Sequence, residues 1–145
     1  MKSVNPYLNF NGNTEEAFKF YKSVFGGEFV ILQRFKDMPG AEKMTPPNEM
    51  NRIMHVSLPL GKVGMLMGSD APESRGMKVA FGNSVNLSIE AESEEEALRL
   101  FKGLSDKGKV AMPIGKQFWG AMYGMCTDKF GINWMINYTY PQAMG

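Results

Sequence analysis

A segment that occurs twice at a fixed spacing constrains this 145-residue chain most. Residues 14–22 (TEEAFKFYK) are similar to residues 94–102 (EEEALRLFK), so that Ala17 corresponds to Ala97. Both segments carry apolar residues at the spacing of an amphipathic helix. Because a repeat at long period marks repeated structural units, we predict a fold built from two similar halves, each with one of these helices.

The start and end signals of both predicted helices agree. Thr14 and Ser93 are placed to cap the helix starts, and the acidic residues that follow suit the positive end of a helix. Glycines at 26, 27 and 108 are placed to end the helices. The predicted buried faces comprise Ala17, Phe18, Tyr21, Val24 and Phe25 in the first helix, and Ala97, Leu98, Phe101 and Leu104 in the second.

Strand signals flank each helix in the same order. The predicted strands cover residues 4–10, 28–36, 52–60 and 62–69 in the first half, and 84–90, 109–114, 119–127 and 132–139 in the second. Each half is therefore a strand–helix–strand–strand–strand unit, and the predicted fold class is α+β. We predict a single domain over residues 1–145, with a first module at 1–70 and a second at 84–140.

Composition excludes several classes of function. With 16 Lys and Arg against 15 Asp and Glu, the chain has no basic field for a nucleic-acid backbone. No apolar run approaches the roughly 18 residues of a membrane span, and the first residues show no export signal. One Cys fits a reducing compartment. We expect no nucleic-acid or membrane partner and a cytoplasmic location.

Short motifs across nearly the whole chain are similar to those of one family. They are NPYL at 5–8, FY at 20–21 with FGG at 25–27, MGSD at 67–70, QFWG at 117–120 and TDKFGINW at 127–134. On these residues the chain resembles the PhnB-like family of the vicinal oxygen chelate superfamily, which includes glyoxalase I, bleomycin-resistance proteins and extradiol dioxygenases.

This resemblance implies two βαβββ modules whose curved sheets pair around a cleft for a small molecule, and it implies a homodimer. It leaves open whether the modules around one cleft come from one chain or from two. Family members are often labelled as a ubiquinone-pathway methyltransferase, but no glycine-rich loop for S-adenosylmethionine follows a predicted strand here.

In metal-using relatives each module supplies ligands from its first and last strands. The aligned positions here are Pro6, Met67, Ser84 and Met135. Proline has no side-chain donor, a thioether suits copper(I) rather than the usual divalent ions, and one hydroxyl does not hold zinc. The chain has one His. We therefore expect no metal of the usual kind and no cofactor.

Strand alternation assigns one row of each sheet to the helix and the other to the cleft. Helix-facing rows are expected at Met54, Val56 and Leu58, at Val85, Leu87 and Ile89, and at Ile132, Trp134 and Ile136. Ile53 is expected to face the cleft. The candidate site consists of His55 as the catalytic residue and Met67, Ser69, Ser84, Asn86, Trp119, Tyr123, Met135 and Asn137 as ligand-binding residues.

Such a lining suits a mostly apolar or aromatic small molecule held by few hydrogen bonds, and suits a phosphate poorly unless Arg34 or Arg52 turns inward. Histidine titrates near neutrality, so His55 is either a general acid or base or a hydrogen-bonded interior residue. Trp119 and Tyr123 either stack on a ligand or fill the core. Alternation places Cys126 on the outer face, as a packing thiol.

Three functions follow as hypotheses. The first is a small-molecule-binding protein without the usual metal centre. The second is a lyase, isomerase or dioxygenase-type enzyme of the superfamily that either uses His55 without a metal or has an atypical metal site. The third is a structural or interaction module whose cleft is filled by its own side chains.

Overall fold

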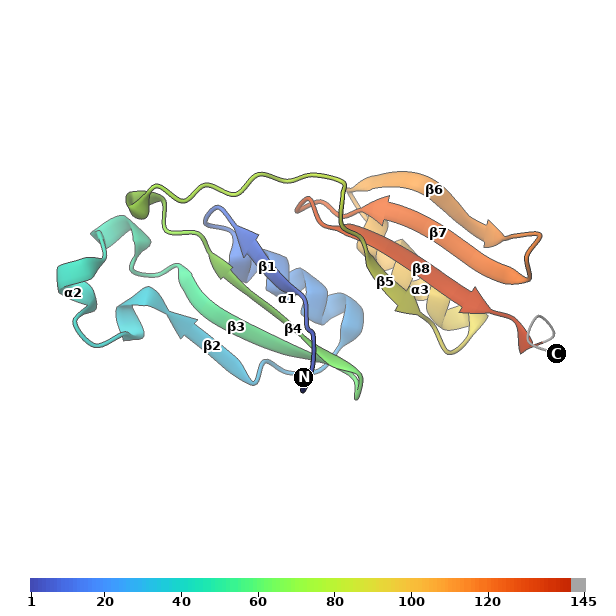
Figure 1. Ribbon diagram of the computed structural model, residues 1–145, viewed down its shortest axis with the longest axis horizontal. Coiled ribbons are helices and arrows are strands. Elements are labelled where there is room, and N and C mark those ends of the chain that lie inside the picture. The colour runs from blue at the N-terminus through green and yellow to red at the C-terminus, as the bar shows by residue number, and fades with distance from the viewer. Residues whose placement is uncertain (142–145) are drawn as a thin grey trace. The chain divides into compact units, whose positions relative to one another are not determined.

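The computed structural model describes residues 1–141, and the chain divides into two compact units, residues 1–80 and 81–145. Within the described residues, each unit contains a four-stranded sheet with a long helix against one face (Figure 1). The predicted α+β fold with two βαβββ units is confirmed. The prediction that residues 1–145 act as one domain stays a prediction.

The first unit has the elements β1 (Tyr7–Phe10), α1 (Thr14–Phe25), β2 (Ile31–Arg34), η1 (Phe35–Asp37), α2 (Ala41–Met44), η2 (Pro47–Glu49), β3 (Ile53–Leu60), β4 (Gly64–Asp70) and η3 (Glu73–Arg75). The second unit has β5 (Leu87–Glu90), α3 (Glu94–Ser105), β6 (Lys109–Lys116), β7 (Ala121–Thr127) and β8 (Asn133–Thr139). The short helices η1, α2 and η2 lie in the long connection between β2 and β3 (Figure 1).

The two sheets have the same topology. Their strand orders are β1-β4-β3-β2 and β5-β8-β7-β6, with a parallel first pair and antiparallel remaining pairs. Their registers also correspond, because Ser57 pairs with Met67 in the first sheet and Met125 pairs with Met135 in the second. The duplication inferred from the helices therefore extends to the pairing of the strands.

Two of the predicted helix signals need correction. Ser93 caps α3 as expected, with its hydroxyl accepting a hydrogen bond from the Glu96 N–H at 3.0 Å. The N-cap of α1 is Asn13 rather than Thr14, because the Thr14 hydroxyl donates to Asp70 instead. Gly26 follows α1 as its C-cap, whereas α3 ends at Ser105, before the glycine at 108.

The buried helix faces follow the predicted pattern, with one residue of each helix less buried than expected. Ala17, Phe18, Tyr21 and Val24 of α1 are buried, whereas Phe25 is half-buried. On α3, Ala97, Phe101 and Leu104 are buried as expected. Leu98 was wrongly placed in the core, since it is exposed and Leu100 is buried instead. The apolar face of α3 is thus rotated slightly from its predicted position.

A close approach between helix and sheet determines which sheet face is covered. A methyl group on Gly68 of β4 would lie 2.6 Å from the Phe18 ring of α1 and 2.8 Å from the Leu8 carbonyl oxygen. A methyl group on Gly124 of β7 would lie 2.9 Å from the Phe101 ring of α3. Because side chains alternate along a strand, the neighbours of these glycines point to the opposite face of each sheet. We call that opposite face the open face.

The predicted helix-facing rows are confirmed in part. Val56, Leu58, Trp134 and Ile136 are buried, whereas Leu87, Ile89 and Ile132 are half-buried. Val85 was wrongly assigned, because β5 begins only at Leu87 and Val85 is 69% exposed. On β3, Met54 is half-buried rather than buried.

Ile53, expected on the cleft side, is also buried, and its N–H donates to Asp70.

Asp70 is a buried carboxylate at the end of β4. Its carboxylate accepts hydrogen bonds from the Gly12 and Thr14 N–H groups at 3.0 Å, from the Thr14 hydroxyl at 2.7 Å and from Ile53 N–H at 2.8 Å. Hydrogen bonds to a charged acceptor are stronger than neutral ones. The Asp70 carboxylate therefore fixes the start of α1 against β3 and β4. Asp70, which follows Ser69, thus has a structural role.

Gly68→Ala should lower the free energy of unfolding by about 1–3 kcal/mol, because the added methyl group meets both an aromatic ring and a backbone oxygen. Chemical denaturation of the purified protein measures this change. Gly64→Ala, on the same strand, is the matched control, since its methyl group would meet only the Asn5 side chain at 3.6 Å. Equal effects of both substitutions would contradict the close approach at Gly68.

Candidate functional site

The open face of the first sheet carries the sequence's one histidine. His55 lies on β3, which pairs with β2 through Gln33 and with β4 through Ser57 and Met67. Met67 in turn pairs with Tyr7 on β1. These side chains share one face, because paired residues of adjacent strands point the same way. Three of the expected site residues, His55, Met67 and Ser69, are thus brought to one surface.

A chain of hydrogen bonds crosses this face. The hydroxyl of Tyr7 and Nδ1 of His55 are 3.1 Å apart, and Nε2 of His55 is 3.0 Å from Oγ of Ser57. The Tyr7 and His55 rings also stack, with centroids 5.6 Å apart and planes 26° apart. Ser57 is 3% exposed, whereas Tyr7 is 44% exposed. The chain therefore leads from a buried hydroxyl to an accessible one.

The other residues of this face are neutral. Met65 and Met67 are half-buried on β4. The Ser69 hydroxyl donates to the Asn9 amide oxygen at 3.2 Å. The face thus combines thioethers, a stacked ring pair and a few neutral polar groups.

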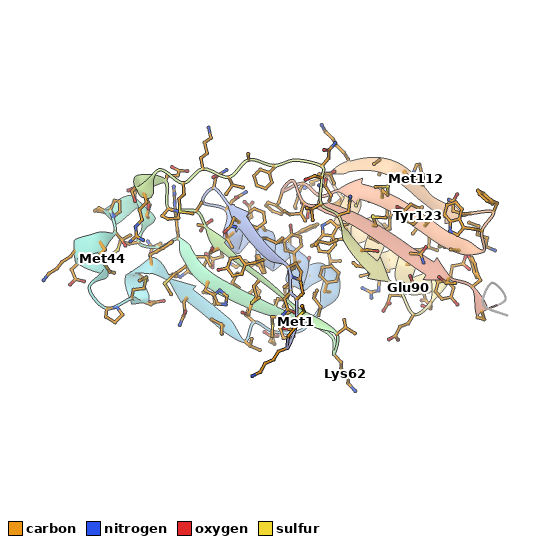
Figure 2. The ribbon with its side chains drawn as sticks, in the orientation of Figure 1. Met1, Met44, Lys62, Glu90, Met112 and Tyr123 are labelled. Carbon is orange, nitrogen blue, oxygen red and sulfur yellow. The ribbon has the colours of Figure 1, made fainter. Side chains whose placement is uncertain are left out.

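The open face of the second sheet has a similar character. Tyr123, Met125 and Met135 are half-buried, and the Trp119 ring meets the Tyr123 ring edge-on at 6.1 Å. The Asn137 amide donates to the Glu90 carboxylate at 2.6 Å. Figure 2 labels Met112, Tyr123 and Glu90 on β6, β7 and β5 of this sheet. Met112 pairs with Met125, so the methionine row continues onto β6.

Three expected site residues lie outside the strands to which they were assigned. Ser84 and Asn86 are exposed and precede β5, so the predicted alternation does not apply to them. Trp119 lies in the turn before β7 and is 50% exposed. On β5, the residue Ser88 pairs with Met135, whereas Ser84 lies before the strand.

Sequence reasoning did not include Tyr7 in the site. It aligned Pro6 and Met67 with the ligand positions of metal-using relatives, whereas the residue of β1 that pairs with Met67 is Tyr7. The hydrogen bond from Tyr7 to His55 joins residues 48 positions apart, which no local pattern reveals. Tyr7 follows Pro6 in the NPYL motif, so an alignment shifted by one residue would have placed Tyr7 in the site.

Two arginines of the first unit, Arg34 and Arg52, form ion pairs with carboxylates rather than with groups around His55. The Arg34 guanidinium binds both carboxylate oxygens of Glu15 on α1, at 2.9 and 2.7 Å, and donates to the Asn51 carbonyl. This hydrogen bonding lowers the pKa of Glu15 below its ordinary value. Arg52 lies 3.8 Å from the Glu73 carboxylate. Neither arginine reaches His55 through a contact in the described part of the chain.

A separate hollow of about 430 Å³ lies away from His55. Asn11, Glu73, Gly76, Met77 and Lys78 line it. The Asn11 amide there donates to the Val79 carbonyl and accepts from the Val79 N–H, at 3.1 and 2.9 Å. The Asn11 side chain therefore holds the segment after η3 in place through both the nitrogen and the oxygen of its amide.

The donors of a metal centre do not come together. Among residues 1–141, no group of three or more His, Cys, Asp or Glu side chains is arranged to hold a metal ion. Pro6, Met67, Ser84 and Met135 supply neither imidazole nor carboxylate. The residues present therefore do not fit the divalent metal centre that the resemblance implies. In the same described range, the structure contains no helix of the length and apolarity that a membrane crossing requires.

The sequence and the fold agree with known proteins. The family model of the Glyoxalase/Bleomycin resistance protein/Dioxygenase superfamily matches residues 3–136, and the chain belongs to this superfamily. Protein YjdN of Escherichia coli K12 is 28% identical over 96% of this chain and 97% of its own length.

Two solved structures are similar over almost their full lengths. Protein PA1353 from Pseudomonas aeruginosa is 37% identical, with a TM-score of 0.83, covering 96% of this chain and 98% of its own. A protein from Bacillus cereus described as a putative 3-demethylubiquinone-9 3-methyltransferase, PhnB protein, is 25% identical, with a TM-score of 0.76 and coverage of 95% and 100%. The resemblance to PhnB-like proteins is thereby confirmed.

The one cysteine should be inert in the folded protein. Cys126 is 2% exposed, and burial raises the pKa of its thiol to about 11, with the Asp128 carboxylate acting in the same direction. A higher pKa means less thiolate near neutral pH. We expect Ellman's reagent to label the native protein more than about a hundredfold more slowly than the unfolded protein. Rapid stoichiometric labelling of native protein would contradict this assignment.

Proposed function

We propose that the protein binds a mostly apolar or aromatic small molecule on the open faces of its sheets, through organic contacts rather than through the usual metal centre. The observation that carries the proposal is the ring pair of Tyr7 and His55, which are stacked and hydrogen-bonded on an open sheet face beside Met67. An exposed aromatic ring next to thioethers is a surface on which a second ring packs favourably.

The distribution of charge supports an uncharged or weakly acidic ligand. The guanidinium of Arg34 is held by Glu15 on the helix side of the sheet. Asp70 is buried among four hydrogen-bond donors. The hydrogen bonds of Tyr7, His55 and Ser69 on this face are to neutral groups, which disfavours a phosphate or phosphonate ligand. Neutral polar groups around apolar ones are typical of sites for small organic molecules.

Met135, Tyr123 and Asn137 extend the proposal to the second unit. Their open face has the same combination of ring, thioether and amide. Ser69, Ser84, Asn86 and Trp119 remain proposed ligand contacts. Trp119 is the best supported of these, because its half-exposed ring already contacts Tyr123.

A metal-free enzyme of the superfamily is the second candidate, with His55 as the acid or base. The hydrogen bond between His55 and the exposed Tyr7 supports it, because a proton can pass along that bond to and from the imidazole. We also propose a single-domain chain that acts as a cytoplasmic homodimer. Family resemblance supports the dimer, and one cysteine in 145 residues supports a reducing compartment.

An aromatic probe tests the binding proposal. We expect 4-nitroanisole, followed by quenching of tryptophan fluorescence and by NMR, to bind the wild type. His55→Ala and Met67→Ser should each weaken binding about fivefold, the equivalent of about 1 kcal/mol for a lost aromatic or thioether contact. Met44→Ser, on exposed α2, is the matched control and should bind like the wild type. Absence of binding, or equal loss in the control, would refute the proposal.

Metal analysis tests the other half of the proposal. After incubation with Ni²⁺, Zn²⁺, Fe²⁺ or Mn²⁺ and desalting, we expect much less than one ion per chain, because the donors at the aligned positions are too weak. The measurement is elemental analysis of protein purified without chelators. Retention of one ion per chain, lost in His55→Ala, would show a metal centre of an unexpected kind.

A further inference from the structure

Both ring nitrogens of His55 are already occupied by protein groups. Nδ1 is 3.1 Å from the Tyr7 hydroxyl, and Nε2 is 3.0 Å from the Ser57 hydroxyl. An imidazole in this position has no free nitrogen to offer a ligand unless one of these bonds breaks. The imidazole is therefore an interior link of the chain rather than its end.

The end of the chain that a ligand can reach is Tyr7. Tyr7 is 44% exposed, whereas Ser57 at the other end of the chain of hydrogen bonds is 3% exposed. A phenolic hydroxyl both donates and accepts hydrogen bonds, so it can pass a proton while remaining neutral. The Tyr7 ring also offers the surface on which an aromatic ligand would stack.

We propose that Tyr7, His55 and Ser57 form a proton relay in which the Tyr7 hydroxyl contacts the ligand and His55 acts through it. The ligand class is an aromatic or enolic compound with an acidic hydroxyl group. This inference rests on the proposed binding function, since it requires an aromatic ligand on this face.

The proton balance of the relay is simple. The O–H bond of the ligand breaks, and its proton passes to the Tyr7 oxygen as the Tyr7 proton passes to Nδ1 of His55. The tyrosine ends neutral, the ligand becomes an oxyanion, and the imidazole becomes an imidazolium. In the receptive state Nε2–H donates to the Ser57 oxygen, which leaves Nδ1 to accept from Tyr7.

The groups around His55 determine which ligand stabilises the imidazolium. From the adjoining strands these are Gln33 on β2, which pairs with His55, and Tyr7 on β1, which is hydrogen-bonded to it, whereas Met67 on β4 pairs with the neighbouring Ser57. Along β3 the neighbour on the same face is Ser57. The nearby charged side chains Arg34 and Asp70 are bonded to Glu15 and Thr14. The oxyanion of the ligand would therefore itself be the counterion of the imidazolium, which favours acidic hydroxyl compounds over their ethers.

A chromogenic phenol tests the relay. 4-Nitrophenol absorbs at different wavelengths as phenol and as phenolate, so its spectrum at saturating protein reports where its proton is. At a pH slightly below the pKa of the free phenol, we expect the wild type to convert the bound probe to phenolate. Tyr7→Phe keeps the ring and loses the hydroxyl, and its bound probe should remain in the phenol form. His55→Gln should do the same, and Met44→Ser should behave like the wild type.

A second readout needs no variant. Because the chain has one histidine, the ring ¹⁵N signals of His55 are unambiguous. Saturation with 4-nitrophenol should move both ring ¹⁵N signals toward those of an imidazolium, whereas saturation with 4-nitroanisole, which has no acidic proton, should not.

The outcomes separate the relay from the binding function. If 4-nitroanisole binds the wild type but bound 4-nitrophenol stays protonated, the relay is wrong and the binding function stands. Phenolate formation that survives in Tyr7→Phe would also overturn the relay, because His55 would then act directly. If neither probe binds the wild type, the binding function itself fails.

Discussion

The contact between each long helix and its sheet is the constraint on which the rest of the structure depends. Gly68 allows β4 to approach the Phe18 ring of α1, and Gly124 allows β7 to approach the Phe101 ring of α3. Apolar burial on the helix side assigns one face of every strand to the core. Strand alternation then places the remaining side chains on the open face. The position of His55 beside Ser57 and Met67 follows from this assignment.

Much of this arrangement was predictable from the sequence. Helix periodicity identified both copies of the repeat, and alternation correctly separated Trp134 and Ile136 from Met135 and Asn137. These features were accessible because burial leaves a periodic trace in neighbouring residues. The fold class and the duplication therefore needed no knowledge of long-range contacts.

The errors have physical causes that sequence patterns do not record. Alternation was extended to Val85, although β5 begins at Leu87, because a polar–apolar alternation does not show where hydrogen bonding to the next strand starts. Leu98 was assigned to the core, because two rows of α3 are apolar and the rotation of the helix chooses between them. Tyr7 was missed, because its partner His55 is set by the register of β1 on β4.

The open face of the first unit departs from the metal chemistry of its superfamily in a specific way. The residue that pairs with Met67 on β1 is a tyrosine, which is not a donor of the usual metal centres. That tyrosine is hydrogen-bonded to an imidazole, which in turn is hydrogen-bonded to a buried serine. On the proposed function, this open face binds its ligand through neutral hydrogen bonds and ring contacts rather than through coordination bonds. The chain belongs to the superfamily, and among residues 1–141 no group of three or more His, Cys, Asp or Glu side chains is arranged to hold a metal ion.

The most direct test of the account is a map of methionine methyl groups, because the chain has 13 methionines. In protein with ¹³C-labelled Met methyl groups, an aromatic ligand on the open faces should shift the signals of Met65, Met67, Met125 and Met135 through its ring current. Met44 on α2 and Met77 beside the separate hollow should not move. Shifts confined to Met77 or Met44 would contradict the account, since the ligand would then bind away from His55.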